Sequence, residues 1–244
     1  MAAMLAAVAL WQGGAAMAGP EYIAGPVDVA ARLARDLASG LLVRHIGATL
    51  IVAGIGLAAG CAAGVALPLV LHHLARARTA LTPYVDASAA VPKYALMPVL
   101  VLWLGIGDLP KVTLVALLVF YPVFTGVSAG LAELDQRLVT SLRVMGARSS
   151  TALRLVMWHA TIPFMTAALQ IAVPRAVSAA IVGECLLGER GIGYLIERSR
   201  QNFDIVGVLA ALVVSLLLVL AAYTLLARVC LRHGTTRPRV AMEI

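Results

Sequence analysis

The chain has 244 residues, of which 61% are hydrophobic and only 13% are charged, and its formal net charge is +7. A soluble domain of this length needs about a quarter charged residues to cover its surface, so the composition excludes a soluble globular protein. The positive charge, which would suggest nucleic acid in a soluble protein, here indicates arginines held at the cytoplasmic face of a membrane. Cys61, Cys185 and Cys230 show no metal-ligand or redox spacing and are interpreted as packing residues.

The first apolar block, residues 2–18, is short and is interrupted by Gln12-Gly13-Gly14. It ends near an Ala-Met-Ala triplet that resembles a signal-peptide cleavage site. No Lys or Arg precedes Arg32, so the basic region of a signal peptide is missing. A retained membrane helix is therefore favoured over a signal peptide.

The next segment, residues 26–44, has the pattern of an amphipathic helix. Val29, Leu33, Leu37 and Leu41 recur at a spacing of four, which places them on one face. We expect a surface helix on the outer side of the membrane, leading into the first long span.

Five further blocks can each cross about 30 Å of hydrocarbon, which takes roughly 20 helical residues. They are residues 46–71, 84–105, 111–131, 162–187 and 205–227. The predicted fold is an all-α integral membrane protein with about six transmembrane helices, five clear plus the short N-terminal one, in a single domain over residues 1–244.

The segment 133–160 is a long charged interruption between these blocks. It carries Arg137, Arg143, Arg148 and Arg154, and its roughly 28 residues far exceed what two adjacent helices need. Its pattern predicts two short helices around Gly146. Such a segment indicates a surface offered to a soluble partner.

The distribution of arginines predicts the orientation. Ten lie in 72–83, 133–160 and 228–244, against six in 19–45 and 188–204. The side with ten is predicted to be cytoplasmic, which places both termini of a six-span chain inside the cell.

Small residues mark helix contacts. Gly56, Gly60 and Gly64 recur every four residues, which favours packing within the subunit, with a contact between two copies as the alternative. The segment 126–130 fits the G-x-S-x-G pattern of hydrolases, but that pattern works on a strand-to-helix turn, so helix packing is preferred. The glycine-rich segment 188–194 is predicted to be an outer turn. The sequence has no Walker A motif, so any nucleotide hydrolysis must occur on another chain.

Prolines in or at the ends of the spans indicate bent helices around a pathway. They are Pro68, Pro92, Pro98, Pro122, Pro163 and Pro174. The candidates to line that pathway are Arg175, Ser178 and Glu184. An arginine at the bilayer centre costs about 2.5–3.5 kcal/mol on insertion scales, so Arg175 should face a cavity or a partner. For Arg175 and Glu184 the alternative role is a structural tie to a loop or a neighbouring helix.

Three stretches of the sequence resemble the permease subunits of ATP-binding-cassette (ABC) importers, in particular the nitrate, sulfonate and taurine group. The first runs from Val91-Pro92-Lys93 through Leu102–Gly107 to Lys111 and Phe120-Tyr121-Pro122; the second is the segment around Gly146; the third runs from Gly183-Glu184 to Gly191-Ile192-Gly193-Tyr194. The resemblance covers about residues 22–227. In the second stretch, Thr140, Ser141 and Leu142 stand where the family has Glu-Ala-Ala, and Trp158-His159 stand where it has Leu-Pro.

The resemblance implies an assembly of two permease subunits, with a homodimer favoured, two cytoplasmic ATPase subunits and a solute-binding protein, in the cell inner membrane. The residues implied in docking the ATPase are Thr140, Ser141, Leu142, Gly146, Ala147 and Arg148. ATP and Mg²⁺ would belong to the ATPase, and no catalytic residue, metal site, cofactor or nucleic-acid partner is expected in this chain. The implied cargo is a small anionic solute such as a sulfonate, nitrate or taurine.

An ion-coupled secondary transporter is the main alternative function. It would usually show inverted repeats and intramembrane carboxylates, whereas no repeat is visible and Glu184 is the only acid within the block 162–187. A membrane-embedded enzyme would need acid, base or metal ligands gathered at one depth, and a plain anchor would not need the prolines or the segment 133–160.

Overall fold

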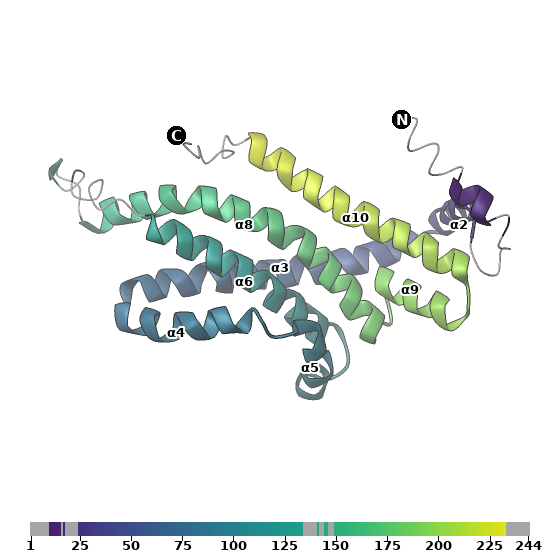
Figure 1. Ribbon diagram of the computed structural model, residues 1–244, viewed down its shortest axis with the longest axis horizontal. Coiled ribbons are helices and arrows are strands. Elements are labelled where there is room, and N and C mark those ends of the chain that lie inside the picture. Colours follow the sequence, from purple (N-terminus) through teal and green to yellow (C-terminus); the bar gives the residue numbers. More distant parts are fainter. Residues whose placement is uncertain are drawn as a thin grey trace. The chain divides into compact units, whose positions relative to one another are not determined.

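The computed structural model describes residues 10–15, 17, 24–133, 141, 144–145 and 149–232. The elements in chain order are α2 (Pro26–Ala38), α3 (Leu41–His73), α4 (Ala75–Ser88), the 3₁₀ turn η1 (Lys93–Leu96), α5 (Met97–Leu104), α6 (Asp108–Ala132), α8 (Ser149–Leu187), α9 (Ile192–Gln201) and α10 (Ile205–Arg232) (Figure 1). Within these residues there is no strand, which confirms the predicted all-α class.

The helices form two compact units by their contacts. Unit 1 comprises Met1–Ile55, Leu96–Leu114 and Val177–Leu220; unit 2 comprises Gly56–Ala95, Val115–Ala176 and Ala221–Ile244. Four helices, α3, α6, α8 and α10, contribute residues to both units.

Among the described residues, four helical segments are long and apolar enough to cross a membrane, and they confirm four of the five predicted long spans. They are Leu41–His72, Asp108–Ala132, Thr161–Gln201 and Ile205–Cys230. The predicted span 84–105 is not one continuous helix. It consists of two pieces, Arg76–Ser88 and Lys93–Leu104, with a sharp bend between them.

Proline explains this break. Pro92 has no amide to donate, and its ring pushes Val91 out of the helical region, so a helix arriving from α4 ends before it. The ammonium group of Lys93 then donates a hydrogen bond to the carbonyl of Ser88 at 2.8 Å, which satisfies one of the carbonyl groups at the end of α4.

In unit 1, α2 packs its apolar face on the first turns of α10. Val29 is buried with Ala24 and Ala210, and Leu33 packs against them. The predicted amphipathic helix is therefore present, but it ends at Ala38 rather than 44, because Gly40 adopts a positive φ of 72° between α2 and α3. Residues 10–15 are helical, and the indole Nε1 of Trp11 donates to the carbonyl of Ala24 at 3.1 Å. The rest of block 2–18, apart from residue 17, lies outside the described residues.

In unit 2, α6 lies between α3 and α8, and glycines set both contacts (Figure 1). A Cβ atom on Gly60 would lie 2.7 Å from the carbonyl oxygen of Ala116. A Cβ atom on Gly64 would lie 2.8 Å from the Cβ atom of Val123, which is one helical turn further along α6. On the other side, a Cβ atom on Gly126 would lie 2.7 Å from that of Ala168. Gly60, Gly64 and Gly126 thus serve helix packing within the chain, as predicted.

Most of the segment 133–160 up to Arg148 lies outside the described residues. Within the part described, the amide of Met145 donates to the carbonyl of Ser141 at 3.0 Å, which is one helical turn. The second of the two predicted short helices is not separate: α8 begins at Ser149 and continues without interruption to Leu187. Pro163 lies inside this helix, which continues past it although proline has no amide to donate.

Candidate functional site

The three predicted pathway residues lie in different surroundings. Arg175, in unit 2, is exposed on α8, whereas Ser178, in unit 1, is half-buried. Glu184, near the end of α8 in unit 1, is 1% exposed. For Glu184 this burial favours the role of a structural tie, and for Arg175 and Ser178 the pathway role stays a prediction.

Arg175 belongs to a cationic group in unit 2. Lys93 and Arg175 are near enough for their positive charges to repel each other. The ammonium group of Lys93 also lies 5.9 Å from the centre of the Tyr121 ring, on α6. Lys93 therefore lies beside an aromatic ring and within electrostatic range of Arg175, and the positive potential of the two cations would favour a negatively charged group.

Glu184 forms the centre of a buried hydrogen-bond network in unit 1. Its Oε2 accepts one hydrogen bond from the Thr49 hydroxyl at 2.8 Å and another from the amide of Gly193 at 3.1 Å. The same Thr49 hydroxyl accepts a hydrogen bond from the amide of Ile192 at 2.9 Å. Oε1 of Glu184 accepts no hydrogen bond from any part of the chain that the structure describes.

His45 completes this network one helical turn before Thr49. Its Nδ1 lies 3.0 Å from the amide nitrogen and 3.1 Å from the carbonyl oxygen of Gly191, and in the tautomer without a proton on Nδ1 it accepts a hydrogen bond from that amide. The His45 ring stacks on that of Tyr194 with centroids 5.7 Å apart. Three consecutive amides, at residues 191, 192 and 193, are thus bound by three side chains. We call His45, Thr49 and Glu184 the amide clamp.

The amide clamp caps the N-terminus of α9. The first amides of a helix have no partner within it, and the capping residue Gly191 has no side chain to supply one. Thr49 from α3 and Glu184 from α8 supply those acceptors instead. The Glu184 carboxylate also lies where the helix dipole favours negative charge.

Two glycines make the clamp possible. A Cβ atom on Gly191 would overlap the carboxyl group of Glu184, and its φ of 111° is one that other residues rarely adopt. A Cβ atom on Gly193 would overlap the carbonyl oxygen of Ile181. The glycine-rich segment therefore brings its backbone directly onto α8.

A second set of charges holds the same turn to α6. Lys111 is 3% exposed and pairs with Asp108 at 2.6 Å, and Arg190 also pairs with Asp108. The buried ammonium group of Lys111 also attracts the carboxylate of Glu184. Arg190 therefore joins the 188–193 turn to Asp108 of α6 within unit 1.

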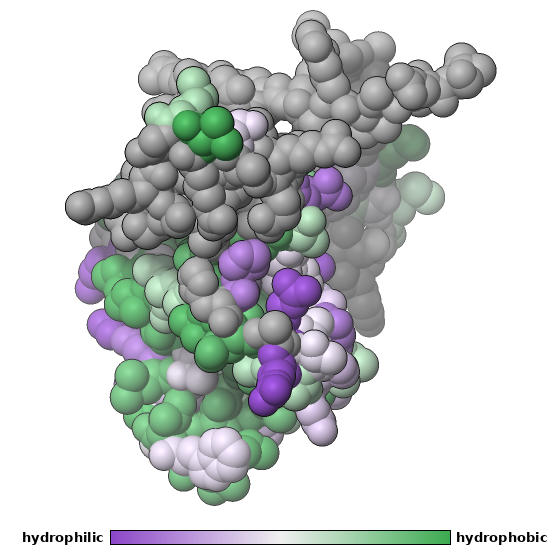
Figure 2. All heavy atoms as spheres, turned by 90° about the vertical axis from the view of Figure 1, so that its left-hand side faces the viewer, coloured by the Kyte–Doolittle hydropathy of each residue, from purple (hydrophilic) through white to green (hydrophobic). Residues whose placement is uncertain are grey.

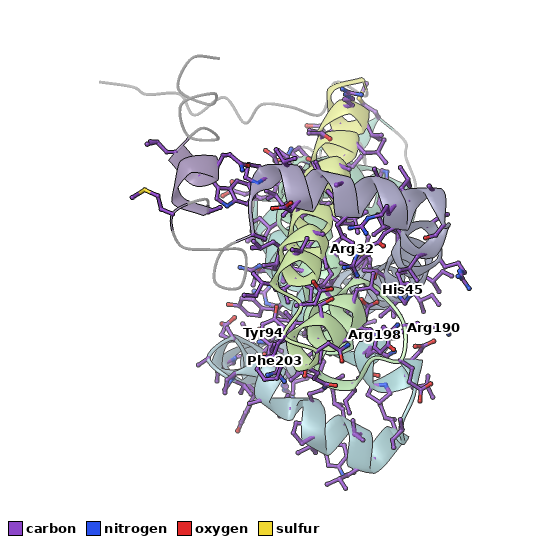
Figure 3. All side chains as sticks on the ribbon, turned by 90° about the vertical axis from the view of Figure 1, so that its right-hand side faces the viewer. Arg32, His45, Tyr94, Arg190, Arg198 and Phe203 are labelled. Carbon is purple, nitrogen blue, oxygen red and sulfur yellow. The ribbon has the colours of Figure 1, made fainter. Side chains whose placement is uncertain are left out.

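The predicted loop 188–204 contains a helix that the sequence interpretation missed. In α9, Ile192, Leu195 and Ser199 are buried at spacings of three and four, which is a helical signal. The helix leads through Phe203, which is 92% exposed at a φ of 55°, into α10. Figure 3 shows His45, Arg190, Arg198 and Phe203 at this end of unit 1.

Asp204 begins α10 and links it to α2. Its carboxylate accepts hydrogen bonds from the amide of Gly207 at 2.8 Å and from Arg32 at 2.7 Å. Burial acts to raise the pKa of the Asp204 carboxyl, but these two hydrogen bonds, together with the positive charges of Arg32 and Arg35, hold the pKa below its ordinary value.

Most of the residues predicted to dock the ATPase are not among those that the structure describes. Thr140, Leu142, Gly146, Ala147 and Arg148 lie outside the described residues, and Ser141 is exposed. The first turn of α4 carries the exposed Arg76 and Arg78. Figure 2 shows hydrophilic side chains among apolar ones on the end of the chain that it views. No group of His, Cys, Asp or Glu among the described residues is arranged to hold a metal ion.

Comparison with known proteins identifies the class. Residues 49–232 match the family described as binding-protein-dependent transport system inner membrane component, and the chain belongs to this family. It is a multi-pass inner-membrane permease component of an ABC importer, as its motifs predicted.

Three relatives illustrate the range of the family. The chain is 33% identical over 210 residues to the formylaminopyrimidine transport permease protein of Halalkalibacterium halodurans, covering 86% of this chain and 84% of the relative. It is 31% identical over 217 residues to the riboflavin transport system permease protein of Chloroflexus aurantiacus, covering 88% and 81%. It is 25% identical over 197 residues to the taurine transport system permease protein of Escherichia coli, covering 79% and 72%.

Proposed function

We propose that two copies of this chain form the translocation pathway for a small anionic solute delivered by a solute-binding protein. Each copy docks one cytoplasmic ATPase subunit through residues 138–150, and ATP and Mg²⁺ act only on those ATPase subunits. The solute-binding protein meets the opposite side, where the 188–204 segment is predicted to lie.

The anionic character of the solute is supported by the position of Arg175. An arginine exposed on the surface of a spanning helix cannot face lipid without a cost of about 2.5–3.5 kcal/mol. A pathway shared by two copies would hydrate it and allow it to meet a carboxylate, sulfonate or nitrate group. Lys93 and Tyr121 would contribute to the same binding surface, because Lys93 lies within electrostatic range of Arg175 and its ammonium group lies 5.9 Å from the centre of the Tyr121 ring.

A neutral heteroaromatic solute is the second candidate. It is favoured by the relatives at 33% and 31% identity, which are named for formylaminopyrimidine and riboflavin transport. Tyr121 could stack on such a ring system, and the two cations would then serve another purpose.

The first test of the assembly is purification of the tagged chain from its native membrane. We expect a stoichiometric Walker-A ATPase to co-purify and to be lost when residues 138–150 are replaced by a flexible linker. Transport by the purified chain without an ATPase, driven by an ion gradient, would instead support a secondary transporter.

The second test concerns the solute, in proteoliposomes containing all subunits. Taurine, an alkyl sulfonate and nitrate are compared with riboflavin and a formylaminopyrimidine. If the solute is anionic, Arg175→Gln should reduce its uptake about 10-fold or more, since a charge-assisted contact of about 1.5–3 kcal/mol is lost. Arg175→Lys should retain most of it. Arg76→Gln, which removes the same charge from the first turn of α4, is the matched control. Uptake only of the neutral heteroaromatic compounds, unaffected by Arg175→Gln, would refute the anionic proposal.

A further inference from the structure

We infer that Glu184 is a positioning residue, which fixes the 188–193 turn and α9 in the one arrangement that the solute-binding protein recognises. This inference rests on the proposed function, because it assigns α9 to the surface that the binding protein meets. It concerns the buried amide clamp, and not the predicted pathway.

The hydrogen bonds of the clamp define the position of α9 directly. The three amides at 191, 192 and 193 are held by acceptors from two other helices, at 3.0, 2.9 and 3.1 Å. A helix normally receives its N-terminal cap from its own preceding residue, and such a cap would leave the helix free to move as a unit. Here the cap belongs to α3 and α8, so α9 cannot move away from them without breaking three hydrogen bonds.

The choice of a carboxylate at this position is not explained by packing alone. Glu184 is 1% exposed, and its Oε1 has no hydrogen-bond partner among the residues that the structure describes. Burying a charged group that is only partly hydrogen-bonded is unfavourable compared with burying an apolar side chain. What Glu184 adds in return is geometric: one oxygen, Oε2, joins Thr49 of α3 to the amide of Gly193 in α9.

The exposed side of α9 is the part that this geometry controls. Arg198 and Arg200 are exposed on α9, and Arg190 is exposed on the turn before it. Phe203 projects at the other end of the helix in a left-handed backbone conformation. Arg190 and Arg200 are already paired with Asp108 and Glu197. The cation of Arg198 and the aromatic ring of Phe203 are therefore the groups that suit an acidic and partly apolar partner surface, and their positions depend on where the clamp holds α9 (Figure 3).

The first experiment measures the clamp in the chain itself. Amide hydrogen exchange of the peptide covering residues 186–196 is followed by mass spectrometry in lipid nanodiscs. We expect Glu184→Ala to accelerate exchange of the clamped amides by 10-fold or more, and Glu184→Gln to remain close to the unmodified chain, since its amide oxygen can still accept both hydrogen bonds. Glu189→Ala, which removes an exposed carboxylate from the same turn, should change nothing. Equal exchange in the Ala variant and the unmodified chain would overturn the inference.

The second experiment measures recognition in the complete transporter, with the binding protein that co-purifies with it. The concentration of binding protein that half-saturates ATPase stimulation should rise at least 10-fold in Glu184→Ala and less than 3-fold in Glu184→Gln. A merely structural role would lower the yield and the maximal rate while leaving half-saturation unchanged, and that result would overturn the inference.

Thr49→Val provides the test if Glu184→Ala fails to assemble. It keeps the shape of the side chain and removes the hydroxyl that links Glu184 to Ile192, so the half-saturating concentration should rise in the same direction. An unchanged value would again refute the positioning role. If the unmodified transporter shows no stimulation by any binding protein, the proposed function fails, while the exchange experiment still decides whether Glu184 holds the turn.

Discussion

The contact between α3 and α6 in unit 2 can be tested by adding a single methyl group at Gly60. In Gly60→Ala the new Cβ would lie 2.7 Å from the carbonyl oxygen of Ala116 and 2.8 Å from Val119, and the carbonyl belongs to a helix backbone that cannot rotate away. Gly54→Ala, on the same helix, meets nothing within 4 Å and serves as the matched control.

The expected magnitudes follow from these distances. Both substitutions gain about 1 kcal/mol of helix propensity. Only Gly60→Ala also carries the cost of overpacking, about 1–3 kcal/mol. The propensity gain cancels in the comparison, so the two variants should differ by about 1–3 kcal/mol. At roughly 2–4 °C per kcal/mol for a chain of this size, Gly60→Ala should melt about 2–12 °C below Gly54→Ala.

Thermal unfolding of both variants in the same detergent, followed by size-exclusion chromatography of the heated samples, measures this difference. Adding Val119→Gly to Gly60→Ala removes both the Cβ and the Cγ1 atom of residue 119 that the new methyl group would meet, and should restore part of the loss relative to Val119→Gly alone. Indistinguishable melting temperatures for Gly60→Ala and Gly54→Ala would refute the close approach of α3 and α6.

Three further predictions concern charges and coupling. Asp108→Asn should destabilise the chain by about 1–3 kcal/mol in chemical unfolding, because it leaves the buried Lys111 without its ion-pair partner. Adding Lys111→Met should reverse most of this loss, and the absence of any reversal would contradict the explanation. Because the pKa of Asp204 is lowered in the folded state, its ionised carboxylate stabilises the fold at pH values above the ordinary carboxyl pKa of 3.8, and this stabilisation is lost as the pH falls through the folded-state value. Asp204→Asn should therefore flatten the dependence of the melting temperature on pH below about 4. An unchanged profile would show that other groups cause that dependence. Gly146→Val should uncouple ATP hydrolysis from uptake in proteoliposomes, since Val cannot adopt the positive φ that a turn between two helices commonly needs; normal uptake would count against a docking role for Gly146.

The spans could be predicted because lipid imposes a simple requirement. About 20 apolar residues must follow one another, and four of the five long blocks meet that requirement as continuous helices. The remaining block, 84–105, has the required hydropathy as well, but hydropathy does not show where the backbone leaves the helical conformation. Pro92 could have been recognised as the point of the break, because the residue before a proline is pushed out of the helical conformation.

The helix α9 was missed because its composition resembles that of a loop. Glu197, Arg198 and Arg200 gave the segment its charged character, while only one narrow side of the helix is buried. The same difficulty applied to α8, whose first turns lie in a charged segment and yet continue into an apolar span.

The amide clamp could not be predicted from sequence patterns. Glu184 was recognised as unusual because it is an acid in an apolar block. Its partner Thr49 lies 135 residues away and has no feature that separates it from other threonines in membrane helices. The glycines of the turn were visible, but their purpose depends on how closely the turn approaches α8, which only the three-dimensional structure provides.

The long separation between Thr49 and Glu184 also has a consequence for biosynthesis. A membrane chain is inserted from its N-terminus, so Thr49 enters the bilayer well before Glu184 is made. Until then the Thr49 hydroxyl can donate its hydrogen bond to the carbonyl of His45, 3.2 Å away in its own helix, so it is not left unsatisfied in the bilayer. The Glu184 carboxylate makes no hydrogen bond within the described part of its own helix, and it arrives when Thr49 is already in place. A circular permutant that began after α3 would reverse this order, and its carboxylate would enter the membrane before the hydroxyl that receives it had been synthesised.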